Sequence, residues 1–303
     1  MATDLVRLLL GSTLMAASDP PRVSIPGSEV HTIQSKSVGA ELRVWIAAPV
    51  APSRPRPPEK PRLVCVLDAD LFFGTVVDTT RLMYQLYQEL PPLVVVGVAY
   101  PTEDRSVQAE LRTRDFTPSH DAQFEEQGKA LAGGREPTLQ SGQRTGGADA
   151  FARFLRDEML PLVRAHHDLA RGDSTLIGSS LGGLFAAWML LSEPGVFDHY
   201  VIISPALWWG KRELFDLEAA TADERAAART RVFLAVGAGE EDARIPSLAP
   251  FRMVSSTREM AERLRARKDA ALELDCRVFD GETHTTVVPV AITHGLRWAY
   301  RAR

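Results

Sequence analysis

A short glycine-flanked turn at residues 178–183 constrains this chain more than any other feature of its sequence. The segment reads Gly-Ser-Ser-Leu-Gly-Gly with Ser180 at its centre, and it lies between the apolar runs 174–177 and 184–191. A strand, a sharp turn and a helix would hold the serine hydroxyl at an exposed, strained tip, with small residues where the two backbones pass closely. This context predicts a nucleophile elbow with Ser180 as nucleophile; the alternative is a glycine-rich turn with an incidental serine.

Apolar runs with strand character alternate with helical segments along the rest of the chain. Strands are expected at 29–37, 41–49, 63–67, 93–100, 174–177, 199–204, 232–236 and 272–279, and helices at 75–90, 148–166, 184–191, 258–268 and 287–301. The first two strands are expected to pair antiparallel at a sheet edge, and the later continuous apolar runs are typical of buried parallel strands. The sequence therefore predicts an α/β fold, with a mostly parallel central sheet and helices on both faces.

The chain shows no convincing domain boundary and no internal repeat, so residues 1–303 are expected to form a single domain. Residues 1–28 are interpreted as an N-terminal extension. Residues 101–148 are polar, contain several glycines and have little periodicity. A connection of this length is usually a lid or binding loop, or else mobile.

Composition and charge exclude several classes of protein. The formal net charge of -4 gives no reason to expect nucleic acid or an anionic membrane as partner, and no apolar stretch approaches a transmembrane helix in length. Cys65 and Cys276 lie in strand-like runs and are expected to be buried, reduced thiols. The cluster 166–168 (His-His-Asp) lacks a partner at metal-ligand spacing, so no metal is expected. Residues 5–10 resemble a signal peptide core, but Asp4 stands where positive charge is expected; a cytoplasmic location is favoured and a periplasmic one stays open.

A serine nucleophile needs a general base, and on this type of sheet the base comes last in the chain. His284 follows the last strand through a glycine-containing loop and precedes the final helix, which makes it the best candidate. His294 lies inside that helix. His199 precedes the acidic loop, which is the wrong order.

The base in turn needs a carboxylate, and three follow the strand at 232–236: Glu240, Glu241 and Asp242. Three carboxylates in a row are normally a solvated turn, but one could point inward and hold the imidazole tautomer. Glu240 is favoured because the chain is expected to turn over the sheet edge there. The other two stay open, as does a Ser-His dyad with a weak contribution from an acid.

The developing oxyanion needs two backbone N–H groups. One is expected from Leu181, directly after the nucleophile, and the other from the turn after the strand 63–67, where Asp70 is the candidate. The alternative for Asp68 and Asp70 is a pair of carboxylates that cap the following helix.

Five segments of the chain resemble the putative esterase family of α/β-hydrolases, which includes esterase D, feruloyl esterases and siderophore esterases. They are 66–70 (Val-Leu-Asp-Ala-Asp), 114–118 (Arg-Asp-Phe-Thr-Pro), 178–183, 204–209 (Ser-Pro-Ala-Leu-Trp-Trp) and 282–284 (Glu-Thr-His) with 295–297 beyond. They occur in family order across residues 30–300. Two departures are Ala69, where the family often has glycine, and Ser179, where histidine is common.

The resemblance implies Ser180 as nucleophile, His284 as base and the Asp70 turn as part of the oxyanion hole. It also implies that the loop with Trp208 and Trp209 borders the substrate pocket; adjacent residues usually face opposite ways, so at most one should touch substrate. Arg114 is a further candidate for substrate contact. The alternative for Arg114 is a structural pair with Asp115.

Together these features predict a serine hydrolase that cleaves a small-molecule carboxylic ester through an acyl-enzyme, with a siderophore-type ester as one candidate substrate. No metal or organic cofactor is required for this chemistry. Thioester hydrolysis and acyl transfer remain open on the same three residues. A non-catalytic ligand-binding protein on a hydrolase fold is the alternative from another class, and the sequence does not predict the oligomeric state.

Overall fold

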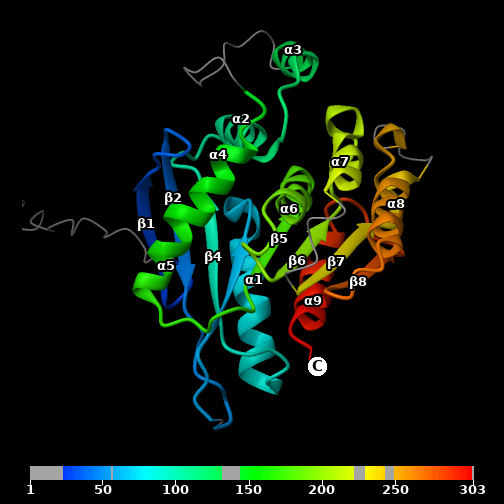
Figure 1. Cartoon of the computed structure of the whole chain (residues 1–303). Helices are drawn as coiled ribbons and strands as arrows, with labels where there is room; N and C mark the ends of the chain where they lie inside the picture. The colour runs from blue at the N-terminus through cyan, green and yellow to red at the C-terminus, as the bar shows by residue number, and fades with distance from the viewer. Residues whose placement is uncertain (1–22, 56, 132–143, 222–228, 243–248, 302–303) are drawn as a thin grey trace, which may run out of the picture.

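The computed structural model describes residues 23–55, 57–131, 144–221, 229–242 and 249–301, and within them a single mixed sheet forms the centre of the molecule (Figure 1). Its eight described strands have the order β1-β2-β4-β3-β5-β6-β7-β8. β2 is antiparallel to both of its neighbours, and all pairs from β4 to β8 are parallel. The strands are β1 Ser28–Gln34, β2 Glu41–Ala47, β3 Arg62–Val66, β4 Leu93–Ala99, β5 Thr175–Ser179, β6 His199–Ile203, β7 Thr230–Gly237 and β8 Leu272–Phe279.

Helices cover both faces of the sheet because successive strand residues point to opposite sides. On β3, Val64 and Val66 pack into the core under α1 (Ala69–Leu82) and α9 (Val287–Ala299), whereas Leu63 and Cys65 pack into the opposite core. That second core lies under α6 (Leu181–Ser192), α8 (Met253–Ala266) and one long helix made of α4 (Ala148–Arg153), η2 (Phe154–Met159) and α5 (Leu160–His166). The predicted α/β-hydrolase fold is confirmed.

The connection 101–148 contains helices that its composition did not indicate. α2 (Arg105–Phe116) and α3 (Ala122–Leu131) lie beyond the carboxyl ends of the parallel strands, at the top of Figure 1. Asp104 caps α2 through hydrogen bonds from the backbone N–H groups of Ser106 and Val107. The sequence shows little helical period over α2 because the buried stripe of this helix is narrow and includes the polar Asp115.

Two other helices differ from the sequence-based expectation. α1 begins at Ala69, six residues earlier than expected, and continues into the π-helix η1 (Met83–Tyr87). α7 (Trp209–Ala220) follows β6 where no helix was predicted, and its backbone is left-handed at residues 210–212. In both cases the helix starts directly after a turn at the sheet edge, where local propensity is a weak guide.

The predictions for the N-terminus concern residues outside the described part of the chain. Residues 1–22 carry the signal-like run, so the cytoplasmic location and most of the expected extension stay predictions. Among the described residues, no helix combines the length and apolar character needed to cross a bilayer. Both cysteines are free thiols; burial raises the pKa of Cys65 to about 12, but Cys276 is only partly buried because β8 is an edge strand.

Candidate active site

Ser180 occupies a strained turn between β5 and α6. Its backbone has φ 59 and ψ -118, a region that a residue with a Cβ rarely adopts. A Cβ on Gly178 would lie 2.1 Å from the carbonyl oxygen of Gly182, and one on Gly183 would lie 2.7 Å from the carbonyl oxygen of Ile203. These close backbone approaches require glycine at positions 178 and 183. The Ser180 side chain lies at the tip of the turn and is partly exposed.

A fully buried carboxylate contacts the predicted base. Oε2 of Glu240 lies 2.6 Å from Nδ1 of His284, while its Oε1 accepts hydrogen bonds from the Ser204 hydroxyl (2.6 Å) and the Gly237 N–H (2.8 Å). Glu240 is 0% exposed. A carboxylate can only accept at this contact, and the matching imidazole tautomer carries its proton on Nδ1 and leaves Nε2 as the basic nitrogen.

The turns that carry these two residues are joined through the backbone. The Gly239 N–H donates to the carbonyl oxygen of Glu282 at 2.9 Å, and a Cβ on Gly237 would lie only 2.5 Å from the same oxygen. The next acid, Glu241, instead accepts from the N–H and the hydroxyl of Ser255 in the first turn of α8. The alternation of direction within one 3-10 turn therefore separates an inward acid from a helix-capping one.

Ser180 and Glu240 are connected through the end of β6. The Ser180 N–H donates to the Ile203 carbonyl at 3.0 Å, and the next residue, Ser204, donates to Glu240. His284 follows β8 and is 30% exposed at its side chain. Within the described residues its recorded side-chain hydrogen bond goes to Glu240 and not to the Ser180 hydroxyl; such contacts are often long before substrate binds. Ser204 carried no predicted role, because only the tertiary fold brings it to the acid.

The two predicted oxyanion donors begin neighbouring helices. Leu181 is the first residue of α6 and Asp70 the second of α1, so neither N–H has a carbonyl partner within its own helix. The Leu67 N–H donates to the Ile177 carbonyl, and a Cβ on Gly182 would lie 3.5 Å from that of Leu67, so the two helix starts are in contact. Burial raises the pKa of the Asp70 carboxyl above its usual range.

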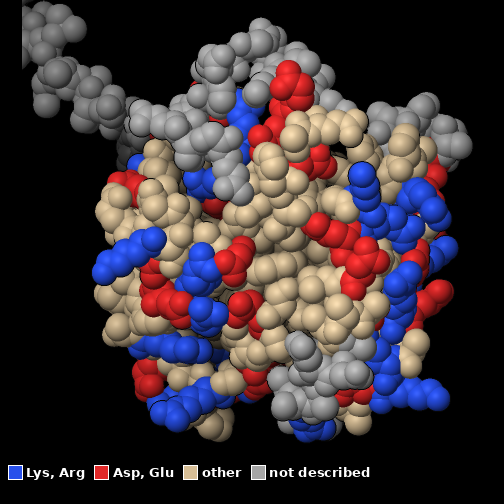
Figure 2. All heavy atoms as spheres, turned by 45° about the horizontal axis from the view of Figure 1, so that its top comes forward, with Lys and Arg blue, Asp and Glu red and all other residues tan. Residues whose placement is uncertain are grey.

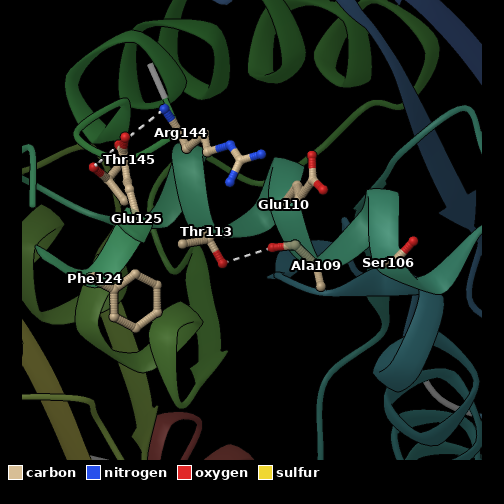
Figure 3. Close-up of a pocket in the computed structure, with 8 residues that line it drawn as sticks. All are labelled: Ser106, Ala109, Glu110, Thr113, Phe124, Glu125, Arg144 and Thr145. Carbon is tan, nitrogen blue, oxygen red and sulfur yellow. Dashed lines mark hydrogen bonds between the residues drawn. The ribbon is translucent and has the colours of Figure 1, made fainter. Parts of the chain in front are cut away.

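A pocket of about 250 Å³ lies between α2 and α3 (Figure 3). It is lined by Ser106, Ala109, Glu110, Thr113, Phe124, Glu125, Arg144 and Thr145. Among the described residues, the buried Nε atom of Arg144 has no hydrogen-bond partner. Ala109 also lines a smaller pocket with Asp70, and the ring of Phe124 lies 6.3 Å from that of Trp208. The segment 101–148 therefore lines a described pocket close to the Asp70 turn and to Trp208.

Trp208 and Trp209 face different surroundings. Trp209 is 1% exposed; its ring packs on Phe124 at 4.9 Å and its Nε1 donates to the Ser119 hydroxyl. Trp208 is half-buried and stacks on the exposed ring of Phe251 at 4.8 Å. Of the two, only Trp208 offers surface to a ligand, so a substrate contact by Trp209 would need its neighbours to move.

Arg114 is held by its neighbour. Its Nε and Nη2 donate to the two carboxylate oxygens of Asp115, which also accepts from the Tyr100 hydroxyl. The carboxylate is buried, and burial raises the pKa of Asp115 although the Arg114 guanidinium opposes the shift. This is the structural pair that was the alternative to substrate contact, and the guanidinium is largely committed to it.

The other histidines lie away from the elbow. His199 is the first residue of β6, at the opposite end of the sheet, 3.2 Å from Asp173. His294 accepts a contact from Arg277 on the outer side of α9. In the cluster 166–168, the His167 ring lies near Glu29 and the Asp168 carboxylate pairs with Lys60. Among the described residues, no group of three His, Cys, Asp or Glu side chains is placed to hold a metal ion.

Known proteins are similar to this chain in sequence and in fold over most of their length. Ferri-bacillibactin esterase BesA of Bacillus subtilis (strain 168) is 29% identical over 279 residues, which cover 91% of this chain and 90% of that protein. The crystal structure of BES protein from Bacillus cereus superimposes with a TM-score of 0.75 at 28% identity, covering 94% of this chain and all of that one. Siderophore hydrolase EstB from Aspergillus nidulans has the same fold, with a TM-score of 0.76 at 22% identity over 93% and 98% of the two chains.

A protein-family model matches nearly the whole described fold. The sequence model of the family named Esterase, described as "Putative esterase", matches residues 35–293. This span runs from the turn after β1 into α9 and includes the elbow, the acidic turn and the histidine loop. The chain therefore belongs to this esterase family and is a carboxylic ester hydrolase of the α/β-hydrolase fold.

Proposed function

We propose that Ser180, His284 and Glu240 form the catalytic triad of this enzyme and hydrolyse a small-molecule ester of the siderophore type. The observation that carries the proposal is the 2.6 Å contact between Glu240 and His284. Both residues follow the carboxyl ends of parallel strands, as does Ser180 on its strained turn. The buried acid fixes the tautomer in which Nε2 accepts the serine proton. The names of the relatives supply the substrate class.

The chemistry proceeds in two transfers. The Ser180 oxygen attacks the ester carbonyl carbon as His284 takes its proton, and the N–H groups of Leu181 and Asp70 stabilise the oxyanion. When the tetrahedral intermediate collapses, the carbonyl–alkoxide bond breaks and His284 protonates the leaving alcohol. Water then gives a proton to the same imidazole as its oxygen attacks the acyl-enzyme carbonyl. When this second tetrahedral intermediate collapses, the bond to the Ser180 oxygen breaks, the acid leaves, and the His284 imidazolium returns the proton to Ser180.

The face at the carboxyl ends of the parallel strands is largely uncharged at its centre. In Figure 2, which brings this end forward, uncharged side chains form most of the centre of the described surface, and Lys, Arg, Asp and Glu lie mainly around it. The pocket between α2 and α3 adds the Phe124 ring and the Nε of Arg144, which has no partner among the residues that the structure describes. An aromatic or acyl group that carries a hydrogen-bond acceptor would complement these two groups.

The test is ester hydrolysis by the purified protein and two serine variants. The enzyme should hydrolyse p-nitrophenyl esters. It should also cleave a siderophore trilactone, and chromatography with mass detection should show products that have gained one water for each ester bond cleaved. Ser180→Ala should lose nearly all turnover, whereas Ser179→Ala, at the buried end of β5, should retain it. Equal activity of Ser180→Ala and wild type would refute the proposal. Thioester substrates and added alcohol acceptors separate hydrolysis of oxygen esters from thioesterase and transfer activity.

A further inference from the structure

The turn between β3 and α1 is held by an unusual residue. Asp68 has φ 54 and ψ 51, the left-handed region that glycine favours and that Asp and Asn tolerate best among other residues. Its carbonyl accepts the N–H groups of Leu71 and Phe72, so this conformation sets where α1 begins and where the Asp70 N–H points. A small change at Asp68 would therefore move a predicted oxyanion donor.

The Asp68 side chain does not cap α1, in contrast to the alternative that the sequence left open. Its carboxylate is held by Arg112 of α2 through two parallel hydrogen bonds, Nε to Oδ1 at 2.6 Å and Nη2 to Oδ2 at 2.9 Å. The Asp68 side chain is only 4% exposed. A Cβ on Gly182 would lie 3.2 Å from Oδ2, so the carboxylate also touches the start of α6, which carries the Leu181 donor.

We infer that Arg112 is a positioning residue for catalysis: its bidentate contact fixes the left-handed Asp68 turn and neutralises the carboxylate between the two oxyanion donors. The inference rests on the proposed function of Ser180, Leu181 and Asp70. Without Arg112, a buried negative charge would stand next to the place where a second negative charge develops in the transition state. A bidentate guanidinium both cancels that charge and sets the angle of the carboxylate.

A merely structural role for Arg112 would be to attach α2 to the body of the protein, but other contacts already do this. The Asp115 carboxylate binds the Tyr100 hydroxyl at the end of β4, and the Arg114 carbonyl accepts the Gly147 N–H. Phe116 is buried in the core that lies under α6. Loss of Arg112 should therefore leave α2 in place and disturb the turn that it contacts.

The experiment compares Arg112→Gln with a matched buried ion pair far from the elbow. Arg267 follows α8 and contacts Glu218 of α7, and the two side chains are 9% and 6% exposed. Along the α8 axis it lies about 18 Å from Ser255, the residue that contacts the acidic turn. Loss of one oxyanion donor costs about 10²–10³ in kcat, so a displaced donor should cost roughly 10–100-fold. We expect that loss in kcat for Arg112→Gln with little change in KM, and an unchanged kcat for Arg267→Gln, at a temperature where melting curves show both variants folded.

Rescue separates charge and position from general damage. Asp68→Asn combined with Arg112→Gln removes both charges and keeps an amide pair that can hydrogen-bond, so it should recover part of the lost kcat. The inference is overturned if Arg112→Gln lowers only the melting temperature, as Arg267→Gln does, or if the double variant is worse than either single one in kcat. A wild-type enzyme that neither hydrolyses esters nor reacts at Ser180 with a fluorophosphonate would instead refute the proposed function, and this inference with it.

Discussion

Replacing Glu240 with glutamine changes one atom in the contact that prepares His284 for proton transfer. Oε1 must still accept from the Ser204 hydroxyl and the Gly237 N–H, so the oxygen of the new amide is held on that side. The NH2 group then faces Nδ1 of His284, 2.6 Å away in the wild type. An amide donor there requires Nδ1 to accept, which moves the imidazole proton to Nε2, where the serine proton should go.

The size of the effect follows from this tautomer switch. The same change in a serine protease lowers kcat by about 10⁴, equivalent to about 5 kcal/mol in the activation barrier. Glu240→Gln should therefore lose about 10³–10⁴ in kcat on a p-nitrophenyl ester, with a fold close to that of the wild type because shape and two of the three hydrogen bonds are retained. A continuous or stopped assay of p-nitrophenol release measures the loss in kcat. Labelling with a fluorophosphonate measures how reactive Ser180 remains.

The control is the adjacent residue. Glu241→Gln keeps one acceptor oxygen for Ser255 but removes the negative charge at the start of α8, so it should cost no more than about 1 kcal/mol of stability, with kcat within twofold of the wild type. Retention of more than a tenth of the wild-type kcat by folded Glu240→Gln would refute the tautomer argument. It would favour the Ser-His dyad that the sequence left open.

Three further outcomes follow from the packing and from the titration of buried groups. Gly178→Ala, whose Cβ would lie 2.1 Å from a carbonyl oxygen of α6, should cost about 3 kcal/mol or more in urea unfolding, whereas Gly74→Ala, with 4.0 Å to its nearest neighbour, should be neutral or stabilising. Trp209→Ala should lose about 3–5 kcal/mol of stability as a buried aromatic, and Trp208→Ala should mainly raise KM; the reverse pattern would contradict their placement. Burial lowers the pKa of His199 below 6.5, so the unfolded chain takes up a proton before the folded one and stability falls with pH below about 6.5; the loss of melting temperature between pH 7 and pH 5.5 should be smaller in His199→Phe.

The sequence predicted the strands well and the upper helices poorly. β3 and β4 are almost continuous apolar runs, which is typical of strands buried on both faces. β5 to β7 have apolar centres beside buried polar residues such as Thr175 and Arg231. α2 is held by a cap at Asp104, a narrow apolar stripe and buried polar contacts of Asp115, none of which gives a clear helical period. Its stability comes from tertiary contacts, which local patterns do not contain.

The sequence by itself determined that Ser180 would stand on a glycine-flanked turn and that His284 would follow the last strand. Both depend on local backbone constraints and on the order of strands in a parallel sheet, which brings their carboxyl ends to one edge. Only the tertiary structure decided which of three adjacent acids meets the imidazole. Glu240 turns inward because the 3-10 turn after β7 places it between His284 and Ser204, whereas Glu241, one residue on, reaches α8. The direction of a side chain in such a turn depends on what packs against it, and those partners come from segments far apart in the chain.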